Sequence, residues 1–179
     1  YMPEARRVID PFAGTGTTPI TLAQMGVATA YCEVNPVMRL VVGAKLGSLG
    51  LSVSARRGLL ETLRNVADQF ESLVRGSEPD AILADDYTHC FGKSTFFDDD
   101  ALQDVLRLRT VCDTVRSDKH LAGELLSIAV ASNLVSCSRL KRAGDVRYKT
   151  KAETARGIPA IVPSVLDQLN GMIRDLDRM

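Results

Sequence analysis

The spacing of apolar residues predicts two short strands near the N-terminus and a series of amphipathic helices after them. An apolar run that ends at Ile9 and a second run at 27–31 suit buried strands, with a helix between them. Downstream, apolar residues recur every three or four positions, which is the period of an α-helix. A short apolar run at 81–84 is a candidate third strand. Capping residues place the starts of further helices at Asn35, at Ser52 or Ser54, at Asp98 or Asp99, at Ser117-Asp118 and at Ser164.

The segment between the two predicted strands is a glycine-containing turn followed by a helix. Gly14 and Gly16 permit a sharp turn and let a ligand approach without meeting a Cβ. We expect Thr18 to cap the helix and Gly26 to end it. The N–H groups at the start of such a helix favour negative charge. The order strand, glycine turn, helix, strand is typical of the first half of a nucleotide-binding βαβ unit.

Two acids at the ends of the predicted strands narrow the class of ligand. Glu33 follows the second strand and can accept two hydrogen bonds from ribose hydroxyls. Asp10 ends the first strand, where its carboxylate would repel a pyrophosphate but attract an ammonium group. Pro19 stands where a dinucleotide-binding turn has its third glycine. We therefore expect a nucleoside joined to an amino acid rather than a dinucleotide.

The stretch Asp10-Pro11-Phe12-Ala13-Gly14-Thr15-Gly16-Thr17-Thr18, with Glu33-Val34-Asn35-Pro36 after it, resembles S-adenosylmethionine-dependent methyltransferases. It is most similar to the amino-methyltransferases of DNA, which make N6-methyladenine or N4-methylcytosine. The resemblance covers about the first quarter of the chain. It implies that the turn holds the methionine part of the cofactor and that Glu33 binds the ribose. The implied cofactor-binding residues are Asp10, Pro11, Phe12, Ala13, Gly14, Thr15, Gly16, Thr17, Thr18, Glu33, Val34 and Asn35.

Composition restricts where a nucleic acid could bind. The formal net charge is zero, so any DNA contact must come from a local patch. Residues 136–151 hold six cations around Gly144 and resemble, more weakly, a segment of a subgroup of these DNA methylases. A solvated basic loop is the alternative interpretation. The residues expected to contact double-stranded DNA are Ser138, Arg139, Lys141, Arg142, Arg147 and Lys149.

Other features favour a cytoplasmic protein without a membrane segment. No apolar run reaches membrane-spanning length and no signal peptide is visible. The four cysteines form no C-x-x-C pair, and with two histidines they complete no zinc pattern. We therefore expect reduced thiols and no metal site.

The predicted fold class is α/β, with an incomplete Rossmann-like class I methyltransferase sheet and a large, mainly helical insert. Residues 1–50 form the predicted S-adenosylmethionine-binding part, and residues 51–163 form the insert, a candidate DNA-contacting region. Residues 164–179 form an amphipathic helix that leads to a missing catalytic half. The family's catalytic motif, two prolines before an aromatic residue, is not found. Asp85-Asp86-Tyr87 lacks those prolines, and no residue is nominated as catalytic.

The resemblance implies a site-specific DNA methyltransferase, as in restriction–modification systems, that transfers a methyl group from S-adenosylmethionine to N6 of adenine or N4 of cytosine. The catalytic motif would lie beyond Met179 or on a partner chain. Three alternatives stay open: an RNA guanine-N2 methyltransferase, a non-catalytic subunit that binds cofactor or DNA, and a nucleotide-binding regulatory module of another class.

Overall fold

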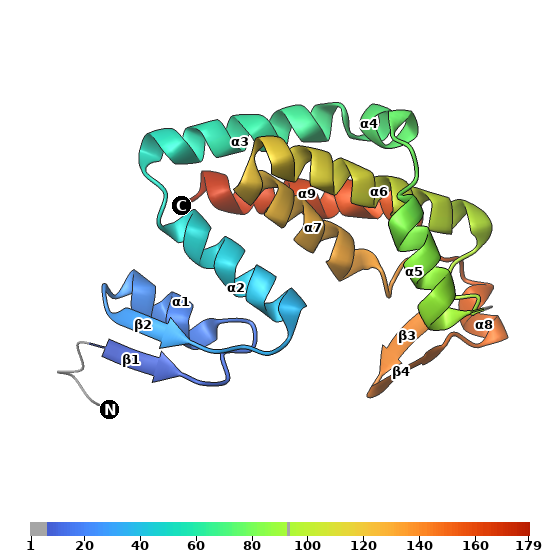
Figure 1. Ribbon diagram of the computed structural model, residues 1–179, viewed down its shortest axis with the longest axis horizontal. Coiled ribbons are helices and arrows are strands. Elements are labelled where there is room, and N and C mark those ends of the chain that lie inside the picture. The colour runs from blue at the N-terminus through green and yellow to red at the C-terminus, as the bar shows by residue number, and fades with distance from the viewer. Residues whose placement is uncertain (1–6, 93) are drawn as a thin grey trace. The chain divides into compact units, whose positions relative to one another are not determined.

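Helices dominate the computed structural model, which describes residues 7–92 and 94–179 (Figure 1). The described residues also form two sheets of two strands each. Contacts between residues divide the chain into two units. We call the first, which extends to Leu59, the sheet unit, and the second, from Leu60 to Met179, the helical unit.

The sheet unit is built on a parallel pair of strands. Strand β1 (Arg7–Asp10) pairs with β2 (Ala28–Tyr31), with Asp10 opposite Tyr31. Helix α1 (Thr17–Gln24) connects the strands, and α2 (Pro36–Leu49) follows the second. Because the strands are parallel, their C-terminal ends meet at one edge of the sheet. The turn after β1 and the acid after β2 therefore lie side by side.

The ends of the first two helices follow from local sequence. Gly16, with φ +86°, is the N-cap of α1, so the prediction that Thr18 caps this helix is wrong. The left-handed conformation of Gly16 turns the chain into the helix one residue before Thr18. Gly26, with φ +72°, follows the end of α1 as predicted. The predicted cap of α2 is also confirmed, because Asn35 Oδ1 accepts from Val37 N–H at 2.9 Å.

One face of the β1–β2 sheet is open. The side chains on one face are half-buried: Val8, Asp10, Thr29 and Tyr31. Ile9 on the other face is 76% exposed. Parallel sheets are ordinarily covered on both faces. In the part of the chain that the structure describes, no third strand joins this sheet. The two predicted strands are confirmed, and an incomplete Rossmann-like sheet stays a prediction.

The helical unit packs around α6 (Asp99–Asp118), α7 (His120–Asn133) and α9 (Ile161–Asp177). Helix α3 (Val53–Asp68) leads into it, followed by α4 (Phe70–Gly76) and α5 (Ala81–Phe91). Helix α4 contacts both α6 and α9. The largest fully buried side chains of this unit form its core: Leu63, Phe70, Val74, Leu108, Leu126, Ile161, Val165 and Leu169.

Several predicted boundaries in the helical unit are wrong. Residues 81–84 begin α5 rather than a strand, because Asp80 Oδ1 caps the helix by accepting from Leu83 N–H at 2.9 Å. The predicted helix after Ser52 is interrupted at Gln69, which separates α3 from α4. Helix α6 begins after Asp98 as predicted but continues through Ser117 and Asp118, and α9 begins at Ile161, before Ser164.

No described helix is long and apolar enough to cross a bilayer.

The basic stretch forms a β-hairpin and a short helix. Strand β3 (Leu140–Ala143) pairs antiparallel with β4 (Asp145–Tyr148), and Gly144, with φ +82°, makes the turn. Helix α8 (Lys151–Thr154) follows directly. Of the hairpin strands, Leu140 is half-buried and the other residues are exposed.

Candidate functional site

The turn after β1 needs its two glycines for different reasons. Both have positive φ, +54° at Gly14 and +86° at Gly16. A Cβ at Gly16 would lie 2.8 Å from Cγ2 of Val42 on α2, so this position must stay small for the turn to pack. A Cβ at Gly14 would meet nothing within 4 Å. Gly14 therefore borders open space, as a glycine beside a ligand would.

The Glu33 carboxylate connects the segments that follow β1 and β2 through hydrogen bonds. Its Oε2 accepts from Gly14 N–H and its Oε1 from Asn35 N–H, both at 2.8 Å. Backbone bonds support this arrangement, because Ala13 N–H donates to Cys32 O at 3.1 Å and Cys32 N–H to Asp10 O at 2.9 Å. Each carboxylate oxygen can accept a further hydrogen bond. The structure thus places the predicted ribose acid directly against the glycine turn.

The other predicted cofactor residues surround this contact. Asp10 is half-buried, and its Oδ1 accepts from Phe12 N–H at 3.1 Å. Phe12 and Val34 are large apolar side chains that are 89% and 91% exposed. Open α/β sheets bind ligands at the carboxyl ends of their strands, where these two side chains lie. Of the rest, Pro11, Thr15, Thr17 and Thr18 are exposed, Ala13 is buried, and Asn35 is the α2 cap.

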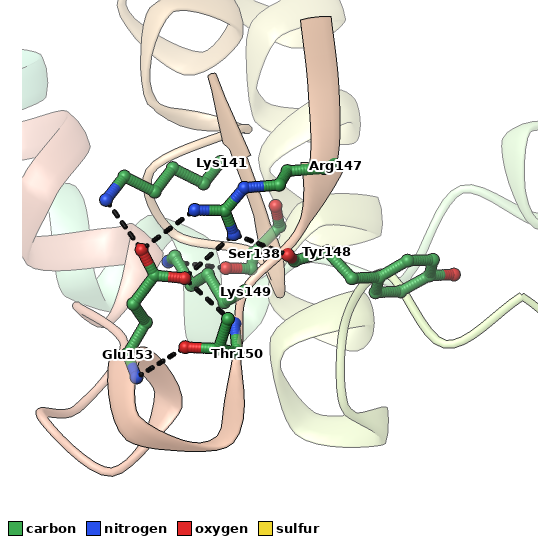
Figure 2. Close-up of polar contacts among 7 residues, drawn as sticks. All are labelled: Ser138, Lys141, Arg147, Tyr148, Lys149, Thr150 and Glu153. Carbon is green, nitrogen blue, oxygen red and sulfur yellow. Dashed lines mark hydrogen bonds and ion pairs between the residues drawn. The ribbon is translucent and has the colours of Figure 1, made fainter. Parts of the chain in front are cut away.

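A carboxylate that the sequence analysis did not single out organises the basic hairpin. Figure 2 shows Glu153 of α8 surrounded by donors. Arg147 binds it through both Nη atoms, at 2.8 and 3.0 Å, and Lys141 Nζ donates to its Oε1 at 2.7 Å. Thr150 N–H donates to Oε2 at 2.9 Å within a capping box. These donors hold the pKa of Glu153 well below its ordinary value, and Glu153 raises the pKa of Arg147.

Lys149 also has partners within the protein. Its Nζ donates to Ser136 O at 2.8 Å and to Ser138 O at 2.7 Å. Ser138 is 2% exposed, and its hydroxyl donates to Val135 O and accepts from Leu140 N–H. Ser138 and Lys149 therefore hold the hairpin to the end of α7.

The two remaining cations predicted to contact DNA differ in their surroundings. Arg139 is half-buried and lines a cavity of about 240 Å³ together with Phe97, Asp100 and Asp104. Arg142 is exposed, and among the described residues its side chain has no hydrogen-bond or ion-pair partner. Of the six residues predicted to contact DNA, four thus have side chains with hydrogen-bond partners inside the helical unit: Ser138, Lys141, Arg147 and Lys149.

An aromatic cluster supports the base of the hairpin. The Tyr148 ring lies 5.7 Å from that of Phe96, which lies 5.3 Å from Phe91 and 6.3 Å from Tyr87. Arg139 N–H donates to Phe96 O at 2.7 Å, so backbone and rings join the same two segments. The hairpin is therefore fixed at its base and exposed towards Gly144.

Comparison of the chain with protein-family models, with curated proteins and with solved structures found no match. Within residues 7–92 and 94–179, no three His, Cys, Asp or Glu side chains are grouped so that they could hold a metal ion.

Proposed function

We propose that the sheet unit binds S-adenosylmethionine and that the chain belongs to a DNA amino-methyltransferase acting on N6 of adenine or N4 of cytosine. The observation that carries the proposal is the hydrogen bond from Gly14 N–H to Glu33. It joins a glycine turn after one parallel strand to an acid after its neighbour, which is the arrangement of a nucleoside site.

The residues at this edge fit the parts of the cofactor. Asp10 would attract the ammonium group of the methionine part, and the unused lone pairs of Glu33 would accept from the ribose hydroxyls. The exposed side chains of Phe12 and Val34 offer apolar surface to an adenine ring. The bound cofactor supplies a methyl group on a sulfonium, ready for transfer to an amine. This chain's own residues would bind and orient it.

The catalytic residues are proposed to come from a downstream segment or a partner chain. The sequence contains no Pro-Pro-aromatic motif. The open sheet face at Ile9, and the outer edges of β1 and β2, which no other described strand pairs with, would accept the further strands of a Rossmann-like sheet. The target base would be flipped out of the duplex, because its amine cannot be reached inside the stack.

The proposal is tested by titrating S-adenosylmethionine into wild-type protein and two glycine variants in a calorimeter. Gly14→Ala places a methyl group in the open space beside Glu33, and we expect at least a tenfold weaker affinity, about 1.4 kcal/mol. Gly26→Ala is the matched control, because Gly26 also has positive φ and open space around its Cβ position but lies at the far end of α1.

Equal affinities of wild type and both variants would show that Gly14 does not border the cofactor. A wild-type chain that binds no S-adenosylmethionine would refute the proposal as a whole. Circular dichroism of both variants checks that their shared backbone strain, about 1–2 kcal/mol, leaves the sheet unit folded.

A further inference from the structure

The two faces of the β3–β4 hairpin carry different chemistry. Directly opposite residues of an antiparallel pair share a face, and the faces alternate along each strand. The register pairs Lys141 with Arg147 and Arg142 with Val146, so these two pairs lie on opposite faces. We call the first the clamped face. The other, with Leu140, Arg142, Val146 and Tyr148, is the open face.

The cations of the clamped face already have an anion. Glu153 accepts from Lys141 and, through two parallel hydrogen bonds, from Arg147 (Figure 2). A phosphate could replace Glu153 only by exchanging one charged acceptor for another, and the capping box of α8 would lose its acid. Contact with the phosphates of a nucleic acid would therefore add little binding free energy at these cations. Their hydrogen bonds to Glu153 instead fix α8 to the hairpin.

The open face is anchored at its base and unoccupied near its turn. Tyr148 packs against Phe96 on the side away from Glu153. Beyond it, Val146 is exposed, and Arg142 opposite has no side-chain partner among the residues that the structure describes. Gly144 adds no side chain at the turn. The exposed end thus presents one unpaired guanidinium beside one apolar side chain.

This combination fits the edge of a DNA base pair. The major groove admits a two-stranded β-ribbon. Arginine donates two parallel hydrogen bonds to O6 and N7 of guanine, and an apolar side chain contacts the methyl group of thymine. The local charge is complementary to DNA even with Glu153 counted, because residues 136–153 contain six cations and two acids.

We propose that the hairpin enters the major groove of duplex DNA with its open face towards the bases. Arg142 reads a guanine, Val146 contacts a neighbouring base, and Lys141, Arg147 and Lys149 hold the hairpin in shape. This assignment depends on the proposed function, because it takes duplex DNA as the substrate.

The test selects duplexes of about 30 base pairs from a randomised library with the wild-type chain and measures variant affinities by fluorescence anisotropy. Arg142→Ala is expected to weaken binding to the selected duplex about 10- to 100-fold. Arg142→Lys keeps the charge but loses the planar fork, so it should relax the preference for guanine at one position. Arg156→Ala is the matched control. It removes another exposed arginine, outside the hairpin, and we expect less than a threefold loss.

Equal losses for Arg142→Ala and Arg156→Ala would overturn the assignment, because they would show general electrostatic attraction without base contact. A wild-type selection that enriches no sequence, or tighter binding of RNA than of duplex DNA, would also overturn it. Titration of S-adenosylmethionine into the same protein separates the two proposals. Cofactor binding without DNA binding refutes the hairpin assignment alone, and Arg142-dependent DNA binding without cofactor binding supports it and refutes the cofactor site.

Discussion

Gly16 is predicted to be a structural glycine whose tolerance to substitution is set mainly by the side chain of Val42 on α2, the nearer of two side chains at this position. An alanine there keeps a positive φ, which costs about 1–2 kcal/mol. Its Cβ would also lie 2.8 Å from Cγ2 and 3.1 Å from Cγ1 of Val42, which is fully buried. Overpacking of this kind costs about 1–3 kcal/mol. We therefore expect Gly16→Ala to destabilise the sheet unit by about 2–5 kcal/mol.

A double-mutant cycle isolates the contribution of the contact. Val42→Ala removes the two methyl groups nearest to the new Cβ and leaves Ile20 Cδ1 of α1 at 3.2 Å, at a cost of about 2–3 kcal/mol on its own. In the Gly16→Ala/Val42→Ala variant the backbone strain stays but the overlap is relieved. We expect the double variant to be about 1–2 kcal/mol more stable than the sum of the single changes.

Native-state hydrogen exchange measures the free energy of opening for each segment. The amides of α1 and α2 report on the sheet unit, and those of α6 and α7, in the helical unit, should be unchanged. The reasoning would be refuted if the free-energy changes of the two single variants summed to that of the double variant within about 0.5 kcal/mol. Val42 would then not be the side chain that excludes a Cβ at Gly16. Undiminished protection in Gly16→Ala alone would refute it equally.

Three further substitutions, all in the helical unit, have predicted effects. Glu153→Gln should speed trypsin cleavage at Lys141 and Arg147, because its neutral amide cannot hold both cations. Equal cleavage of both proteins at neutral pH would contradict this role of Glu153. In the wild type the lowered pKa of Glu153 means that its stabilisation is present above the ordinary value of 4.5 and is lost as the pH falls towards the folded-state pKa. Gly123→Ala would overlap the backbone of Arg116 where α7 crosses α6, so we expect about 2 kcal/mol of destabilisation. Gly171→Ala in α9, where the nearest atom is 3.8 Å away, should instead stabilise by about 0.5–1 kcal/mol. Urea denaturation followed by circular dichroism checks both: a stabilising Gly123→Ala contradicts the first prediction and a destabilising Gly171→Ala contradicts the second.

The sheet unit could be predicted well because its determinants are local. A glycine with positive φ, an Asn cap and an acid after a strand each act within a few residues of themselves. Asn35 and Gly26 therefore have the predicted roles. Thr18 does not, because Gly16 already turns the chain into the helix. Nothing local determines whether further strands cover Ile9.

The helical unit was harder to predict because weak local signals had to decide between alternatives. A four-residue apolar run suits a strand or a helix equally, and Asp80 one residue before it was the decisive cap. Ser117 resembles a cap, but its hydroxyl donates to Thr114 O within α6. The pattern Thr150-x-x-Glu153 was a readable capping-box signal for α8. Its second role, binding Lys141 and Arg147, depends on strand pairing that the spacing of charges does not reveal.

The hairpin shows why the number of cations in a sequence overstates the charge that a surface offers. The six cations of residues 136–151 suggest a broad phosphate clamp. Glu153 and two backbone carbonyls engage Lys141, Arg147 and Lys149 within the protein. Each phosphate neutralised contributes about −0.9 to the slope of log affinity against log salt, so a clamp of six would give about −5. A hairpin that reads bases through Arg142 requires a much shallower slope and a stronger dependence on sequence. Under the proposed assignment the hairpin loses general attraction to phosphates but gains rigidity, and rigidity is what a side chain needs to distinguish one base edge from another.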